Sequence, residues 1–361
     1  MENANNKNII WINVAKFIGI FLVIFQHNLG QVFHLWENCG TIYFWLHGLI
    51  LQFHMPLFFV LAGYLYKDKG FQENINKIIW ALLIPYLLYQ ILYFPMALGW
   101  EVIGHHISIG IAFKKLLLGI LFGDVVSDNN LFITCCGPCW FIIAMIWVRL
   151  VFAKISLNVF NACIIAFISI GLLIFLISQK LSIYFCIIPA LYCLPYFILG
   201  NILTKLHIPT TDKYTNRKKE ILFFLIFFFI SCFILFTTHE IVRVPNIIDI
   251  NSIKQLFFCY AAGISGSIAT IFLSKTIYST KNFINTISKN TLFIIFFHFV
   301  ILYIEKISFI YKITNYTNIF ENLFLIMASS ILNLILCYFV IKLAEKYCPV
   351  LLGKYRPKNN I

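Results

Sequence analysis

Long apolar stretches recur along the whole chain and are separated by short polar segments that carry most of the lysines. Because the hydrocarbon core of a bilayer takes a helix of about 20 apolar residues, stretches of this length predict membrane-spanning helices. Backbone polar groups in lipid must be bonded within the segment, which favours helices. The pattern therefore predicts an all-α, polytopic membrane protein with about ten transmembrane helices in one bundle, near 9–32, 43–66, 77–99, 138–154, 160–178, 183–203, 220–238, 254–274, 289–310 and 321–344.

The composition supports this interpretation and excludes an ordinary soluble chain. Of the 361 residues, 61% are hydrophobic and only 11% charged. With no internal repeat and no linker-like segment visible, residues 1–361 are expected to form a single transmembrane domain. The first apolar run, Ile9 to Leu29, is too long for the apolar part of a cleavable signal, so it is expected to remain as the first span.

The charge distribution predicts the orientation of the chain. Lysine and arginine number 27 against 14 acidic residues, an excess that in a membrane protein is first a topology signal. With the N-terminus inside, 19 basic residues fall on the cytoplasmic side and 7 on the other, with Lys16 left aside as intramembrane. Both termini are therefore expected in the cytoplasm, with the chain in the inner (plasma) membrane. The aromatic residues are dispersed through lipid-facing runs, so nucleic-acid binding is not expected.

The segment 100–137 is long and mixed in character. Its apolar piece, Ile111–Phe122, is too short to span, so we expect an outer loop with a re-entrant or interfacial helix. The same segment ends in TCCGPCWF, where Cys136-Gly-Pro-Cys139 matches the core of a thioredoxin site. No strand is predicted before it and a hydrophobic helix follows it at once, so Gly137-Pro138 is interpreted as a helix start.

Ionisable residues inside the predicted spans are the candidates for function, because such residues are costly in lipid. In the first span, NVAKFIGIFLVIFQHNLG, Lys16 and His27 are eleven residues apart. At about 100° and 1.5 Å per residue they share one helix face, roughly 16 Å apart along the axis. This spacing favours a polar track through the bundle. The alternative is that Lys16 reaches the inner headgroups and His27 caps the outer helix end.

Four further residues can likewise be interpreted either as functional or as structural. His54 precedes a Met-Pro pair, where it either stabilises a proline kink or has a function. His298 and Glu305 are seven residues apart, near one face of the ninth span. This pairing can orient the imidazole or form part of a proton path, or the two are simply polar residues near an outer helix end. Arg149 is either a topology anchor or a phosphate ligand. No metal-binding, phosphate-loop or nucleophile-elbow motif is present in the sequence.

Taken in order, these features resemble the membrane acyltransferase-3 family, and within it the fucose O-acetylase-like branch. The basic residue, ten intervening residues and histidine of the first span are similar to the family pattern. FHMPLFFVLAGYL at 53–65, GPCWFIIA at 137–144 and TLFIIFFH at 291–298 resemble further family blocks, with Ala62 standing where the family has serine.

The resemblance implies an O-acyltransferase that moves an acetyl or similar acyl group from cytoplasmic acyl-CoA to a hydroxyl of a cell-surface or lipid-linked glycan. His27 is then the catalytic residue, and Lys16 and Arg149 bind the acyl-CoA. His54 and Trp140 shape the passage, with His298 and Glu305 on the polar track. Acyl-CoA is a substrate, and no permanently bound cofactor or metal is expected. The alternative from another class is a proton-coupled transporter or flippase of a glycan precursor.

Overall fold

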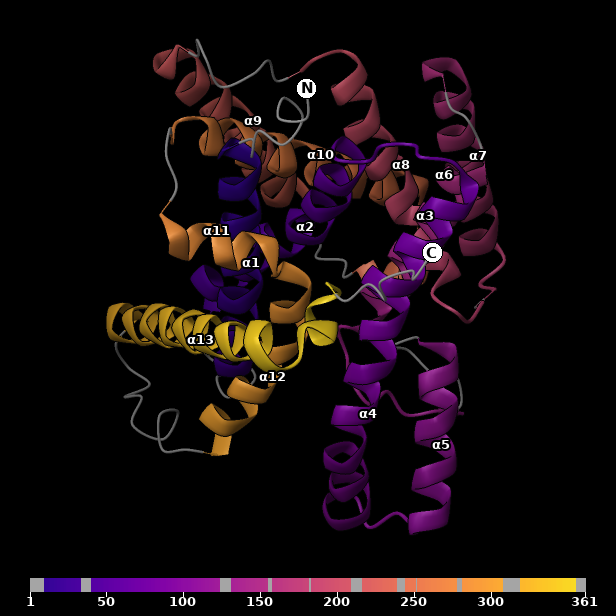
Figure 1. The fold of residues 1–361 in the computed structure, drawn as a ribbon. Helices are drawn as coiled ribbons and strands as arrows, with labels where there is room; N and C mark the ends of the chain where they lie inside the picture. Colours follow the sequence, from indigo (N-terminus) through magenta and orange to yellow (C-terminus); the bar gives the residue numbers. More distant parts are fainter. Residues whose placement is uncertain are drawn as a thin grey trace. The chain divides into compact units, whose positions relative to one another are not determined.

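A computed structural model of the chain describes residues 10–33, 40–123, 131–154, 158–181, 183–208, 216–238, 244–250, 252–277, 281–307 and 319–354. Within these ranges the regular structure is helical and contains no strand, as the sequence predicts (Figure 1). The chain divides into two compact units, and each is described by itself. The single domain expected for residues 1–361 stays a prediction.

The first unit comprises the described parts of Met1–Tyr64, Leu203–Val242 and Lys254–Lys342. Its helix α1 packs most extensively against α2 and also contacts α11 and α12. Gly19 of α1 faces Leu57 and Phe58 of α2, where an added Cβ would lie 3.1 Å from both side chains. The helices are α1 (Ile10–Phe33), α2 (Gly40–Tyr64), α9 (Arg217–Thr238), α10 (Ile253–Lys275), α11 (Asn282–Lys289), α12 (Thr291–Ile307) and the larger part of α13 (Ile319–Tyr347).

The predicted ninth span, 289–310, corresponds to α12 and begins at a sharp bend after α11. Helices α11 and α12 meet at an angle of 91° around Asn290. The amide of Asn290 donates to the carbonyl of Thr286 at 2.7 Å, which satisfies an acceptor that the end of α11 leaves free. The short α11 packs against α1, where Asn13 donates to Asn285 at 3.1 Å.

The second unit is built around one long helical run. This run covers Phe71–Gly104 and so extends the predicted span 77–99 at both ends. It consists of α3 (Phe71–Ile78), η1 (Ile79–Leu83), α4 (Ile84–Gly99) and η2 (Trp100–Gly104), and it is followed by α5 (Ile109–Phe122). Helices α4 and α5 lie side by side as a hairpin (Figure 1). The segment expected as an outer loop therefore begins as a continuation of the preceding helix.

The rest of the second unit contains the shorter helices and two 3-10 turns. It includes α6 (Cys139–Lys154), α7 (Val159–Ser178), most of α8 (Ile187–Lys205), η5 (Val244–Asp249) and η7 (Pro349–Leu352). Over the described residues, eight helices are long and apolar enough to cross a membrane, or nine if α11 and α12 form one bent span. The fourth predicted span, 138–154, corresponds to α6, which has only 16 residues and is not among these helices.

Candidate functional site

Two of the histidines singled out in the sequence lie together in the first unit. The rings of His27 on α1 and His298 on α12 have centroids 5.3 Å apart and planes tilted by 42°. Phe299 closes one side of the pair, with its ring 4.6 Å from that of His27 in an edge-on arrangement. His27 is partly exposed, whereas His298 is fully buried. The pair joins two segments that are 271 positions apart in the sequence.

The position of the proton on His298 follows from its hydrogen bond. Its Nδ1 lies 2.7 Å from the carbonyl oxygen of Ile294, one turn earlier on α12. A carbonyl only accepts, so Nδ1 donates, and in the neutral ring Nε2 then carries the lone pair. That Nε2 atom is buried and has no hydrogen-bond partner among the described residues. The site therefore presents an oriented, unpaired imidazole nitrogen in the immediate surroundings of His27.

The other predicted residues of the first unit have separate positions. Lys16 is partly buried on α1, on the same helix face as His27 by its spacing. His54 is 4% exposed, and its Nδ1 donates to the carbonyl of Ile50 at 2.9 Å on its own helix, which fits the structural alternative. Glu305 falls in the last turn of α12, and its side chain lies outside the described residues.

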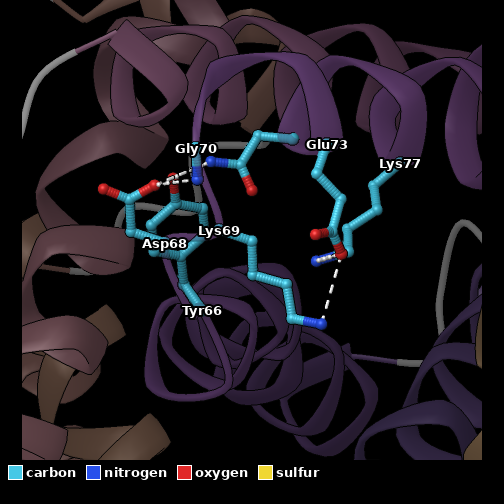
Figure 2. A network of polar contacts seen from close by, with 7 residues as sticks. Tyr66, Asp68, Lys69, Gly70, Glu73 and Lys77 are labelled. Atoms are coloured by element: carbon cyan, nitrogen blue, oxygen red, sulfur yellow. Dashed lines mark hydrogen bonds and ion pairs between the residues drawn. The ribbon is translucent and has the colours of Figure 1, made fainter.

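A network of polar contacts orders the chain just beyond α2, in the second unit (Figure 2). The side chain of Asn74 on α3 donates to the hydroxyl of Tyr66 at 3.2 Å and to the carboxylate of Asp68 at 3.0 Å. Tyr66 in turn donates to the carbonyl of Phe152 on α6 at 2.9 Å. Burial, helped by the nearby Asp68, raises the pKa of Tyr66 to about 12, so the phenol stays protonated and keeps this bond.

Beside this network lies a cavity of about 260 Å³ lined by four cationic side chains, Lys67, Lys69, Lys77 and Arg149. Lys69 and Lys77 each lie 3.2 Å from the Glu73 carboxylate, which holds both ammonium groups in place (Figure 2). Arg149 comes from the C-terminal half of α6, and its buried Nε has no hydrogen-bond partner among the residues that the structure describes. A guanidinium with a free N–H in a cationic cavity can bind phosphate oxygens.

The remaining residues of interest in the second unit are buried and apolar in character. Trp140 is 7% exposed and contacts Phe141 edge-on. Cys135, Cys136 and Cys139 are buried free thiols, while Cys39 lies outside the described residues. Burial raises the pKa of the Cys135 thiol to about 12, which is the reverse of what a reactive thiolate requires.

Sequence reasoning missed several polar contacts around the histidines. Asn333 of α13 donates to the backbone carbonyl of His298 at 3.2 Å, and the Nε2 atoms of Gln26 and His47 lie 2.9 Å apart. The sequence carries a signal for them, because asparagine and serine recur at helical spacing in the last predicted span. Within the described part of the chain, no group of three His, Cys, Asp or Glu side chains is arranged to hold a metal ion.

The fold and the histidine site define a multi-pass membrane protein with imidazole and cationic groups at helix contacts. The comparison with protein families identifies it further: the acyltransferase-3 family model, described as an acyltransferase domain, matches residues 9–342. The chain therefore belongs to this family and is a membrane acyltransferase. Neither a curated protein nor a solved structure shows a significant match to the chain.

Proposed function

We propose that the chain is a membrane O-acyltransferase of the fucose O-acetylase-like branch. It moves an acetyl or similar acyl group from cytoplasmic acyl-CoA to a hydroxyl of a cell-surface or lipid-linked glycan, in the inner (plasma) membrane. The single observation that carries it is the pairing of His27 with His298.

The chemistry of acyl transfer requires what this pair offers. The acceptor hydroxyl forms a new C–O bond to the thioester carbonyl, the C–S bond breaks, and the hydroxyl proton ends on the CoA thiol. An imidazole can take that proton as a general base, or can carry the acyl group itself. His27, partly exposed, is placed in this reacting role, and the unpaired Nε2 of the buried His298 is available to accept a hydrogen bond from the hydroxyl or from His27.

The donor side is supported by the cationic cavity of the second unit. Acyl-CoA is an anion with several phosphate groups, and Arg149 with the three lysines is complementary to that charge. Arg149 and the three lysines belong to segments that the charge count predicts on the cytoplasmic side, where acyl-CoA is found. Lys16, about 16 Å from His27 along α1, is assigned to a phosphate or to the thioester of the donor.

The test is the release of CoA thiol by purified protein in proteoliposomes supplied with acetyl-CoA and glycan acceptors. Removing the imidazole in His27→Ala is expected to lower turnover about 10²–10⁴-fold, the usual contribution of a positioned acid–base group. The matched control is His105→Ala, which removes an imidazole that is 53% exposed and lies 3.0 Å from the Glu101 carboxylate. That variant is expected to keep the wild-type rate.

Two results would contradict the proposal. A wild-type protein that transports an acceptor without releasing CoA thiol would belong to the transporter class. A folded His27→Ala protein with more than about a tenth of the wild-type rate would remove His27 from the reacting role, since this loss is well below that expected of a general base.

A further inference from the structure

The last helix of the first unit, α13, carries a buried polar stripe. Asn322, Ser329, Ser330 and Asn333 are each at most 7% exposed. At about 100° per residue, Asn322, Ser329 and Asn333 fall within roughly 40° of one another around the axis. The other flank of α13 is apolar and exposed, with Phe324 at 72%. The polar stripe therefore faces the interior of the unit and not the lipid.

The C-terminal part of this stripe, from Ser329 to Asn333, is bonded to both helices of the histidine pair. Ser329 donates to the side-chain oxygen of Asn28 at 3.2 Å, and Asn28 donates to the hydroxyl of Ser330 at 3.0 Å. Asn28 directly follows His27 on α1. Asn333 donates to the backbone carbonyl of His298. The stripe therefore begins at the histidine pair, and its polar groups there are satisfied by protein.

Asn322, at the other end of the stripe, differs from these residues. It is 1% exposed, and neither its amide nitrogen nor its amide oxygen has a hydrogen-bond partner among the described residues. Its neighbours Leu323 and Ile326 pack into an apolar cluster with Phe25, Leu29 and Tyr43. A buried amide with both atoms unpaired destabilises the free protein, so a leucine would serve packing better at this position.

We propose that Asn322 and the α13 stripe form the acceptor subsite, which binds the neutral hydroxyls of a glycosyl unit. This inference rests on the proposed transfer to a glycan hydroxyl. An amide offers one acceptor and two donors, which match adjacent sugar hydroxyls. The stripe from Asn322 to Asn333 contains only neutral polar groups, so it suits a neutral sugar and not the phosphates of the donor. Asn322 lies about 16 Å from Asn333 along the axis, near the end of α13 that the charge count places on the outer side.

The experiment uses the purified full chain and a panel of p-nitrophenyl glycosides as acceptors, with acetyl-CoA as donor. Asn322→Leu is expected to raise the KM for the acylated glycoside about tenfold or more, because two hydrogen bonds to the acceptor are lost. The KM for acetyl-CoA is expected to stay unchanged. The matched control is Phe324→Leu on the exposed flank of the same helix, which is expected to leave both KM values unchanged.

A second measurement is independent of turnover. The glycoside alone is expected to raise the thermal unfolding midpoint of wild-type protein, as a ligand of the folded state does. In Asn322→Leu this rise is expected to disappear, while the midpoint without glycoside equals or exceeds that of wild type. A lower midpoint without glycoside would assign Asn322 a structural role and overturn the proposal. If Asn322→Leu does not fold, Asn322→Ala takes its place in both measurements.

The two proposals fail in different ways. An Asn322→Leu protein with wild-type acceptor KM and a wild-type rise in midpoint overturns the acceptor subsite and leaves the proposed transferase intact. Wild-type protein that neither acylates a glycoside nor releases CoA thiol overturns the proposed function. In that case a midpoint rise that depends on Asn322 would still support a sugar site on α13, and its absence would overturn the subsite as well.

Discussion

Arg149 is the side chain that we expect to contact a phosphate group of the acyl-CoA donor. Its Nε is buried without a described partner, in a cavity that three lysines also line. Hydrogen bonds to charged groups contribute about 1.5–3 kcal/mol each, which corresponds to roughly 10- to 100-fold in affinity. Arg149→Gln is therefore expected to raise the KM for acetyl-CoA by about this factor. The KM for S-acetylpantetheine, which lacks the nucleotide phosphates, should be unchanged.

The control for this prediction is Lys154→Gln. It removes one positive charge from the same helix, five residues further on, at an exposed position outside the cavity lining. If these positive charges act only by long-range electrostatic attraction, salt should screen the effects of the two substitutions alike. Equal effects of the two variants, or an equal loss with S-acetylpantetheine, would count against a phosphate contact at Arg149.

At the residue scale, the spacing of residues within one helix could be predicted from the sequence, whereas contacts between side chains of different helices could not. Lys16 and His27 share a face because eleven residues make about three turns, which the sequence states directly. The contact of His27 with His298 depends instead on how α12 approaches α1, and no periodicity encodes that. The same holds for Lys67, Lys69 and Lys77: the sequence indicated their side of the membrane, whereas their grouping around Arg149 depends on the turn between α2 and α3.

At the scale of elements, the packing of α10 against α2 depends on one glycine. A Cβ built on Gly266 would clash with the ring of Phe53, the residue that precedes His54. Phe53 is 7% exposed, so its ring has little room to move. Gly266→Ala is expected to destabilise the first unit by about 1–3 kcal/mol, the usual cost of overpacking, and to lower the thermal unfolding midpoint.

The matched control is Gly171→Ala in α7, where nothing lies within 4 Å of the added Cβ. Alanine in a helix interior is up to about 1 kcal/mol more favourable than glycine, so this variant should keep or raise the midpoint. Equal midpoints for the two variants would show that the contact of α10 with Phe53 is looser than the structure has it.

The long helical run Phe71–Gly104 shows why the boundaries of helices could not be predicted from the sequence. Pro85 lacks an N–H and leaves the carbonyl of Ala81 without its usual helical partner. The chain widens into the π-helix Ile79–Leu83 at this point, with the N–H of Ile84 donating to the carbonyl of Ile79. The helix therefore continues through the proline. The run begins with the mostly polar residues FQENIN of α3, so the apolar pattern marked only the middle of this run.

At the scale of the whole molecule, the number of crossings decides the topology. Among the described residues, eight helices are long and apolar enough to span, or nine if α11 and α12 form one bent span. Helix α6, at 16 residues, is the shortest of the ten segments that the sequence predicted. The distribution of basic residues favours a cytoplasmic position for both termini, which requires an even number of crossings. A chain with ten crossings and a chain with fewer crossings place defined segments on different sides of the membrane. A missing crossing at α6, for example, would reverse the side of every segment after it.

Fusion reporters can therefore test α6 and α12 separately. With ten crossings, reporters near residues 156 and 210 and at the C-terminus are expected to be cytoplasmic, and one near residue 180 on the outer side. If α6 does not cross, the reporters near 156 and 210 become active outside and the one near 180 inside. If only the bent pair of α11 and α12 fails to cross, the reporter near 210 stays inside and the C-terminal one moves outside. The expectation rests on the 19-to-7 division of basic residues, which no single helix length outweighs.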